Sequence, residues 1–173
     1  ALGALTKLCI SRRMYDKAIP LAKEALELSE KHKGRSSLET CVLMDTNAIL
    51  KECLGDKQGA MVLYEEVLAT RVHLLPMTDS RVITSVRHLA ELCQDLRNFE
   101  DSERYYRQLV GLARDAHGEL SGDYADALVA KGWAILYTSV AAIEATNFKA
   151  FHQLHRSMRK AKVPDLPKPT SAS

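Results

Sequence analysis

The sequence predicts an all-α fold in which three and a half to four helical hairpins stack into an α-α superhelix, followed by a C-terminal capping helix. Three observations support this prediction. Segments recur every 42 residues, apolar residues within them recur at spacings of three and four, and the composition favours helices. Only eight Gly and five Pro occur in 173 residues, and good helix formers are common. With 46% apolar and 27% charged residues, the chain can bury a core and cover a soluble surface.

The 42-residue period holds across three units without a gap. It aligns RMYDKAIPLAKEALEL, GDKQGAMVLYEEVLAT and RNFEDSERYYRQLVGL, which begin at residues 13, 55 and 97. Small residues coincide at Ala18, Ala60 and Ser102, where they would let two antiparallel helices approach closely. Other matching positions are Leu8, Leu50 and Leu92; Ala22, Tyr64 and Tyr106; and the breaks at Gly34, Pro76 and Gly118. We therefore expect units near residues 1–36, 37–78, 79–120 and 121–145.

Each unit contains two helical stretches. In the third unit, apolar residues from Val86 to Cys93 recur at helical spacing and form one face of the first stretch. The second stretch runs from about Phe99 to His117, with the acids of its first turn favourably placed for the helix dipole. The pattern predicts an antiparallel hairpin in every complete unit.

The C-terminal region departs from the period. A fourth unit begins in register, but Glu144 falls where a small residue is due, so we expect one longer helix over 121–145. Residues 146–162 predict a separate basic, amphipathic helix, and residues 163–173, with three prolines, predict a disordered tail. Residues 149–173 carry a net charge of +5, which leaves −3 for residues 1–148.

The repeat pattern resembles the tetratricopeptide repeat. The motifs that carry this resemblance are VRHLAELCQDLRNFEDSERYYRQLV and NAILKECLGDKQGAMVLYEEVL, and it extends from about Leu2 to Tyr137. The usual repeat has 34 residues, so a period of 42 is similar to the longer repeats of kinesin light chains. Asn47 and Lys51 depart from the pattern, because the matching positions of units one and three are apolar.

The resemblance implies a concave groove that is lined by the first helix of each unit. Carrying the family's groove positions onto this chain implies a candidate protein-binding groove that is mixed in charge at its centre and apolar at one end. Its candidate residues are Lys7, Asp45, Ile49, Glu52, Arg87, Glu91, Gln94 and Trp133, with Ile10, Val129 and Leu136 at neighbouring positions.

Trp133 is the only tryptophan, and two roles are open to it. The C-terminal helix could fold over the indole, with Phe148 or Phe151 packing on the ring. Alternatively, the indole could contact a partner, because aromatic residues are enriched at binding hot spots.

No catalytic or cofactor motif is found. Neither a phosphate-binding loop nor a nucleophile elbow occurs, and GDKQGA is expected to be a turn between helices. Cys9 and Cys93 occupy matching positions on the expected core face, and no C-x-x-C is present. His152 and His155 lie one helical turn apart without a third ligand. We therefore predict a non-enzymatic protein without a cofactor or a metal site.

Three functional hypotheses follow from the sequence. The first is an adaptor or scaffold that holds a peptide or helix of another protein in the groove. The second is a structural subunit of a large complex, docked through its ends and its C-terminal tail. The third is RNA binding by the basic C-terminal helix, although the overall charge of +2 gives nucleic acid little support. No small-molecule substrate is expected.

The expected location is the cytoplasm. No apolar run approaches the roughly 20 residues that span a bilayer, and we predict no membrane span. Because the sequence does not begin with Met, a mitochondrial or other organellar protein after removal of a targeting segment is the alternative.

Overall fold

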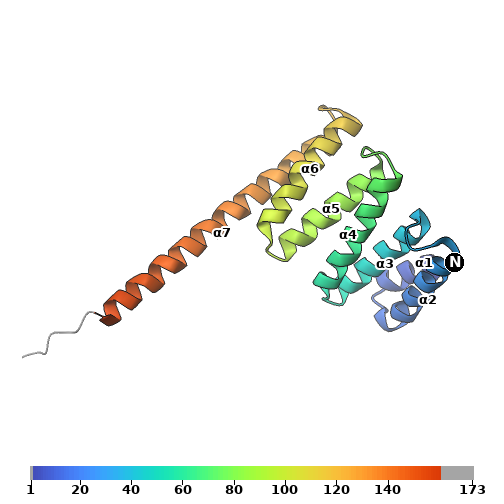
Figure 1. The fold of residues 1–173 in the computed structure, drawn as a ribbon, viewed down its shortest axis with the longest axis horizontal. Coiled ribbons are helices and arrows are strands. Elements are labelled where there is room, and N and C mark those ends of the chain that lie inside the picture. Colours follow the sequence, from blue (N-terminus) through green and yellow to red (C-terminus); the bar gives the residue numbers. More distant parts are fainter. Residues whose placement is uncertain (1, 161–173) are drawn as a thin grey trace, which may run out of the picture.

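Within residues 2–160, seven α-helices follow one another and pack mainly against their neighbours in sequence. The computed structural model describes residues 2–160, and Figure 1 shows the helices stacked from the N-terminus to the long final helix. The helices are α1 (Leu2–Ser11), α2 (Tyr15–Lys33), α3 (Leu38–Cys53), α4 (Lys57–Leu74), α5 (Ser80–Asp95), α6 (Phe99–His117) and α7 (Gly122–Lys160). The predicted all-α array of helical hairpins is confirmed.

Three hairpins, α1–α2, α3–α4 and α5–α6, share one turn geometry. The residues Arg13, Gly55 and Arg97 all adopt a positive φ, between 57° and 87°. In the α5–α6 turn the amide of Asn98 donates to the carbonyl of Cys93 at 2.8 Å, and the same bond recurs 42 residues earlier, from Asp56 to Lys51, at 2.9 Å. The side chains of Asp56 and Asn98 then cap the helices that follow. The 42-residue period thus includes the turns.

The core lies between the two helices of each hairpin and between successive hairpins. Ala18, Ala60 and Ser102 are fully buried, as their small size predicts. The hydroxyl of Ser102 donates to the carbonyl of Ala90 at 3.0 Å, which shows how closely α5 and α6 approach each other. Asn47 is polar where the matching positions of units one and three are apolar. Its side-chain amide is satisfied within α3, because it donates to the carbonyl of Leu43 at 2.9 Å. Cys9, Cys41 and Cys93 are buried, and Cys53 is exposed.

The predicted break between residues 145 and 146 is wrong. The predicted helices 121–145 and 146–162 form one helix, α7, of 39 residues. Residues 139 and 140, which match the turn at Gly55 and Asp56, are Ser and Val, and the helix continues through both of them. Glu144 stands where the other hairpins bury Ala or Ser, and a charged side chain there opposes close packing. The predicted tail, 163–173, lies outside the described residues.

Joining the two helices gives α7 a segment with the length and hydropathy of a membrane-spanning helix. This segment is Gly122–Ala150, with a mean hydropathy of 1.2 in its most apolar window. Only 11% of that window is buried. The sequence prediction of no membrane span rested on the absence of an apolar run of roughly 20 residues, because Thr138 and Ser139 interrupt the most apolar stretch. Core helices of soluble proteins can have the same length and composition as membrane-spanning helices. These two properties alone therefore do not show that α7 crosses a membrane.

Candidate functional site

One exposed side chain from the first helix of each unit falls at the same repeat position. These residues are Lys7 on α1, Ile49 on α3, Glu91 on α5 and Trp133 on α7, each 42 residues from the next, and they are here called the groove row. All four side chains are exposed, and Trp133 retains 54% of its accessible surface. The row therefore presents a cation, an aliphatic group, an anion and an aromatic ring in that order along the array.

Arg87 lies one turn before Glu91 on α5 and is half-buried. Among the described residues, no ion pair engages either side chain. Their charges act in opposite directions on the pKa of Tyr106, which burial raises above its usual value. Arg87 and Glu91 are thus charged groups at the centre of the array that the fold leaves available.

Three other predicted groove residues hold the fold together. The Tyr64 hydroxyl on α4 donates to the Glu52 carboxylate on α3 at 2.6 Å. At the matching positions of the next hairpin, the Tyr106 hydroxyl lies 3.3 Å from the Gln94 side-chain oxygen. Each bond joins the two helices of one hairpin near the turn. Glu52 and Gln94 consequently have structural partners, and so does the third residue, Asp45.

Asp45 forms an ion pair with Arg71, which is 4% exposed and lies on α4. The same guanidinium donates to the Ser85 hydroxyl at 2.7 Å and to the Arg81 carbonyl at 3.3 Å, so it joins α3, α4 and α5. Burial raises the pKa of Asp45, while the positive charge of Arg71 opposes that rise. Removing one partner from such a pair leaves a buried charge unpaired, which costs about 3–5 kcal/mol.

Beside this ion pair lie two buried polar atoms that have no hydrogen-bond partner among the described residues. They are Oδ1 of Asp45 and Nδ1 of His88. The His88 ring packs on the Tyr64 ring, with centroids 5.1 Å apart. Because neighbouring side chains cover both atoms, they belong to the interior below the groove rather than to its surface.

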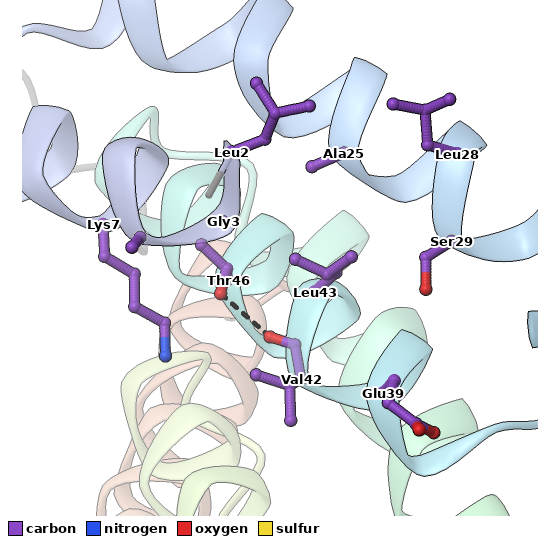
Figure 2. Close-up of a pocket in the computed structure, with 11 residues that line it drawn as sticks. Leu2, Gly3, Lys7, Ala25, Leu28, Ser29, Glu39, Val42, Leu43 and Thr46 are labelled. Atoms are coloured by element: carbon purple, nitrogen blue, oxygen red, sulfur yellow. Dashed lines mark hydrogen bonds between the residues drawn. The ribbon is translucent and has the colours of Figure 1, made fainter.

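An apolar cleft of about 630 Å³ adjoins the N-terminal end of the groove row. Figure 2 shows its lining, with Lys7 at one end and Glu39 at the other. The apolar part comes from Leu2 on α1, Leu28 on α2 and Val42 on α3. The remaining lining residues are Gly3, Ala4, Ala25, Ser29, Leu43 and Thr46. Sequence reasoning missed this cleft, because it forms between two hairpins and no single motif marks it.

Trp133 is not covered by a C-terminal helix. Phe148 lies 15 residues further along the same straight helix, about 22 Å away at 1.5 Å per residue, so it cannot pack on the indole. The indole instead lies beside Tyr137, with centroids 6.4 Å apart, and lines a small pocket together with Gln94, Tyr106 and Ala130. The expectation of core packing under Phe148 is therefore wrong.

The described residues show no metal-binding cluster. Among the side chains that the structure describes, no three His, Cys, Asp or Glu gather in a way that could hold an ion. The side chains of His152 and His155 lie outside that set.

The tetratricopeptide-repeat sequence profile matches residues 1–36 and 85–117. No curated protein sequence matches the chain. Several solved structures resemble it across nearly its whole length, among them the following two. BtubC (BKLC) from P. vanneervenii has a TM-score of 0.72 at 17% identity, covering 99% of this chain and 68% of that one. A putative kinesin light chain with nearly identical TPR-like repeats from Podosopora anserina has a TM-score of 0.71 at 15% identity, covering 96% and 77%. At these identities the likeness is one of fold.

Proposed function

We propose that the chain is a scaffold that binds a segment of another protein along the groove row. Its residues 1–36 and 85–117 match the tetratricopeptide-repeat profile, and repeats of this kind generally mediate protein–protein interaction. The observation that carries this proposal is the groove row itself. Four successive units each present one exposed side chain at the same position, while neighbouring positions are occupied by structural contacts. A row of this kind suits an extended or helical ligand that runs along the array.

The chemistry of the row describes the ligand. An acidic side chain would suit Lys7, a basic one would suit Glu91, and an apolar anchor would suit the cleft between α1, α2 and α3. At the other end, Trp133 offers an aromatic surface of the kind enriched at hot spots. The expected ligand is therefore a mixed-charge segment with apolar side chains near both ends.

A charge swap on α5 tests the groove. The double substitution Arg87→Glu and Glu91→Arg reverses the two charges at spacing i, i+4 and should weaken ligand binding by at least about tenfold through like-charge contacts. Helicity and melting temperature should stay unchanged, because neither side chain has an ion-pair partner among the described residues. Native affinity capture with mass spectrometry identifies the ligand, and titration with the isolated ligand measures the loss.

The matched control is Lys23→Glu with Glu27→Lys. These residues form an exposed i, i+4 pair on α2, with 3.8 Å between the charged atoms, away from the groove row. The control should retain the ligand. If the ligand binds the α5 double variant as tightly as the unaltered chain, the groove row is not the binding site.

A second candidate function is a structural subunit that docks into a larger assembly through its C-terminal end. The apolar surface that α7 exposes supports it, and Val129, Leu136 and Ile143 are each at least 49% exposed. An assembly subunit of this kind would keep its partners after the α5 charge swap. The same experiment therefore separates the two candidates.

A further inference from the structure

The face of α7 that points away from α6 carries a continuous row of uncovered apolar side chains. On the packed face, Ala127 and Ala134 are buried against α6, and the Thr138 hydroxyl lies 3.4 Å from the Phe99 carbonyl oxygen. At 100° per residue, the opposite face contains side chains that are between 43% and 61% exposed. They are Val129, Trp133, Leu136, Val140 and Ile143.

These positions follow a heptad pattern. Starting at Val129, the steps alternate between four and three residues to Leu154. The eight positions, here called the α7 seam, are Val129, Trp133, Leu136, Val140, Ile143, Asn147, Ala150 and Leu154. An average spacing of 3.5 residues is the signature of a two-stranded coiled coil, and the seam is about 38 Å long at 1.5 Å per residue.

One polar residue lies within the seam. Asn147 occupies the same heptad position as Trp133 and Val140 and is exposed. An asparagine at such a position lowers the stability of a coiled coil. The seam is therefore apolar apart from this one position.

We propose that α7 pairs along this seam with α7 of a second copy of this chain, in antiparallel orientation. A two-fold interface requires a surface that is complementary to itself, and the seam meets this requirement. Antiparallel alignment places Trp133 opposite Ala150, so that the largest seam side chain faces the smallest. The same alignment places Val140 opposite Ile143 at the centre.

Charge favours the antiparallel orientation. The first turns of α7 contain Asp123 and Asp126, whereas its last two turns contain Arg156, Arg159 and Lys160. Antiparallel pairing brings the acidic beginning of one helix beside the basic end of the other, and it also opposes the two helix dipoles. Parallel pairing would bring like charges together at both ends.

The shape of the molecule agrees with this orientation. In Figure 1 the other six helices lie at one end of α7, and the rest of that helix extends away from them. Antiparallel pairing therefore places the two arrays at opposite ends of the helix pair, where they do not compete for space. Of the groove row, only Trp133 also belongs to the seam, so the charge swap on α5 does not test this proposal.

Light scattering and sedimentation equilibrium of the full chain measure the association. The unaltered chain should form a species of twice 19.3 kDa. Val140→Glu should raise the dimer dissociation constant at least about 100-fold, because it buries an unpaired charge in the seam. Ile135→Glu is the matched control: its side chain is 42% exposed, against 43% for Val140, but lies off the seam. This control should leave the constant nearly unchanged, and circular dichroism should show equal helicity for all three chains.

Cysteine cross-linking tests the orientation. In a Cys53→Ser background, chains with Leu136→Cys and chains with Asn147→Cys should form a disulfide when mixed, because antiparallel pairing places these positions opposite each other. Neither variant should cross-link alone. Self-cross-linking of the Leu136→Cys chain would overturn the antiparallel orientation.

Three further outcomes would overturn the proposal. The first is a chain that remains monomeric at every concentration. The second is a dimer that Val140→Glu leaves intact. The third is a chain that is monomeric in buffer but floats with phosphatidylcholine vesicles, which would assign the apolar surface of α7 to a bilayer.

Discussion

Small side chains at single positions determine how closely the helices of a hairpin pack. Ala60 on α4 and Ala48 on α3 are both fully buried and belong to the same apolar cluster. Neither position has room for a larger group, because well-packed interiors contain few voids. The free energy of unfolding that is lost when one of these side chains is enlarged therefore measures how closely α3 and α4 approach each other.

Ala60→Leu should lower the free energy of unfolding by about 1–3 kcal/mol through overpacking. Chemical denaturation followed by circular dichroism measures the change. Val62→Leu on the same helix is the control, because Val62 is 63% exposed and enlarging it should have little effect. Equal stability of the Ala60→Leu chain and the control would mean that this hairpin is not closely packed.

Sequence reasoning succeeded at residues whose environment is set by their own repeat unit. The burial of Ala18, Ala60 and Ser102 follows from the period alone. It was less successful for the candidate groove, where Asp45 is engaged by Arg71 from another helix. Local spacing cannot reveal a partner that is brought close only by tertiary packing, and the cleft beside Lys7 was missed for the same reason.

At the scale of single helices, the main difference from the sequence prediction lies in α7. The α3–α4 hairpin turns where Gly55 adopts a positive φ and the Asp56 side chain caps the next helix. Ser139 and Val140 occupy the matching positions in α7, and the helix continues through them. The break near residue 145 was predicted from the loss of repeat register at Glu144, but a lost packing position does not end a helix.

Restoring the turn should fold α7 into a fourth hairpin. The triple substitution Ser139→Gly, Val140→Asp and Glu144→Ala supplies the positive-φ residue, the cap and the small packing residue that the α3–α4 hairpin has at Gly55, Asp56 and Ala60. Small-angle X-ray scattering should show a maximum dimension about 30 Å shorter, because some 21 residues fold back at 1.5 Å each. Helicity should change little.

The reference for the scattering measurement is the Val140→Glu chain. We expect this chain to be monomeric and to keep α7 as one long helix. Glu144→Ala in the Val140→Glu background is the control and should remain extended, because it lacks the turn. An extended triple variant would show that a further property of α7 keeps the helix straight.

At the scale of the whole molecule, carboxylates that bind Arg, Lys or backbone groups connect the ends and turns of several helices. Asp56 caps α4, Glu66 binds Arg35, and Asp79 caps α5. Hydrogen bonds from neighbouring cationic side chains are the first cause that lowers the pKa of each, to about 2 for Asp79 beside Arg81. These residues are spread over several helix junctions, so their titration affects the array as a whole.

The molecule should lose stability as the pH falls from about 4 toward 2. A carboxylate whose pKa is lower in the folded state contributes stability that is fully present above its unfolded pKa of about 4 and is lost as the pH falls through the folded value. Asp79→Asn keeps a capping side chain but removes one such group, so its melting temperature should fall less steeply over this range. Thermal melts followed by circular dichroism measure both chains.

The control for the pH measurement is Asp16→Asn. Asp16 is exposed in the first turn of α2 and accepts no hydrogen bond from a described side chain. The Asp16→Asn chain should show the same fall in melting temperature between about pH 4 and pH 2 as the unaltered chain. Parallel profiles for the Asp79→Asn and Asp16→Asn chains would mean that the Asp79 cap contributes nothing to acid sensitivity.

The buried guanidinium of Arg71 has a mechanical consequence. Its bonds to Asp45, Ser85 and the Arg81 carbonyl tie together three helices from two hairpins, so sliding α5 past α3 must stretch several charge-assisted hydrogen bonds at once. The middle of the array is therefore held by directional polar bonds as well as by apolar packing, and we expect it to keep its curvature when a ligand binds.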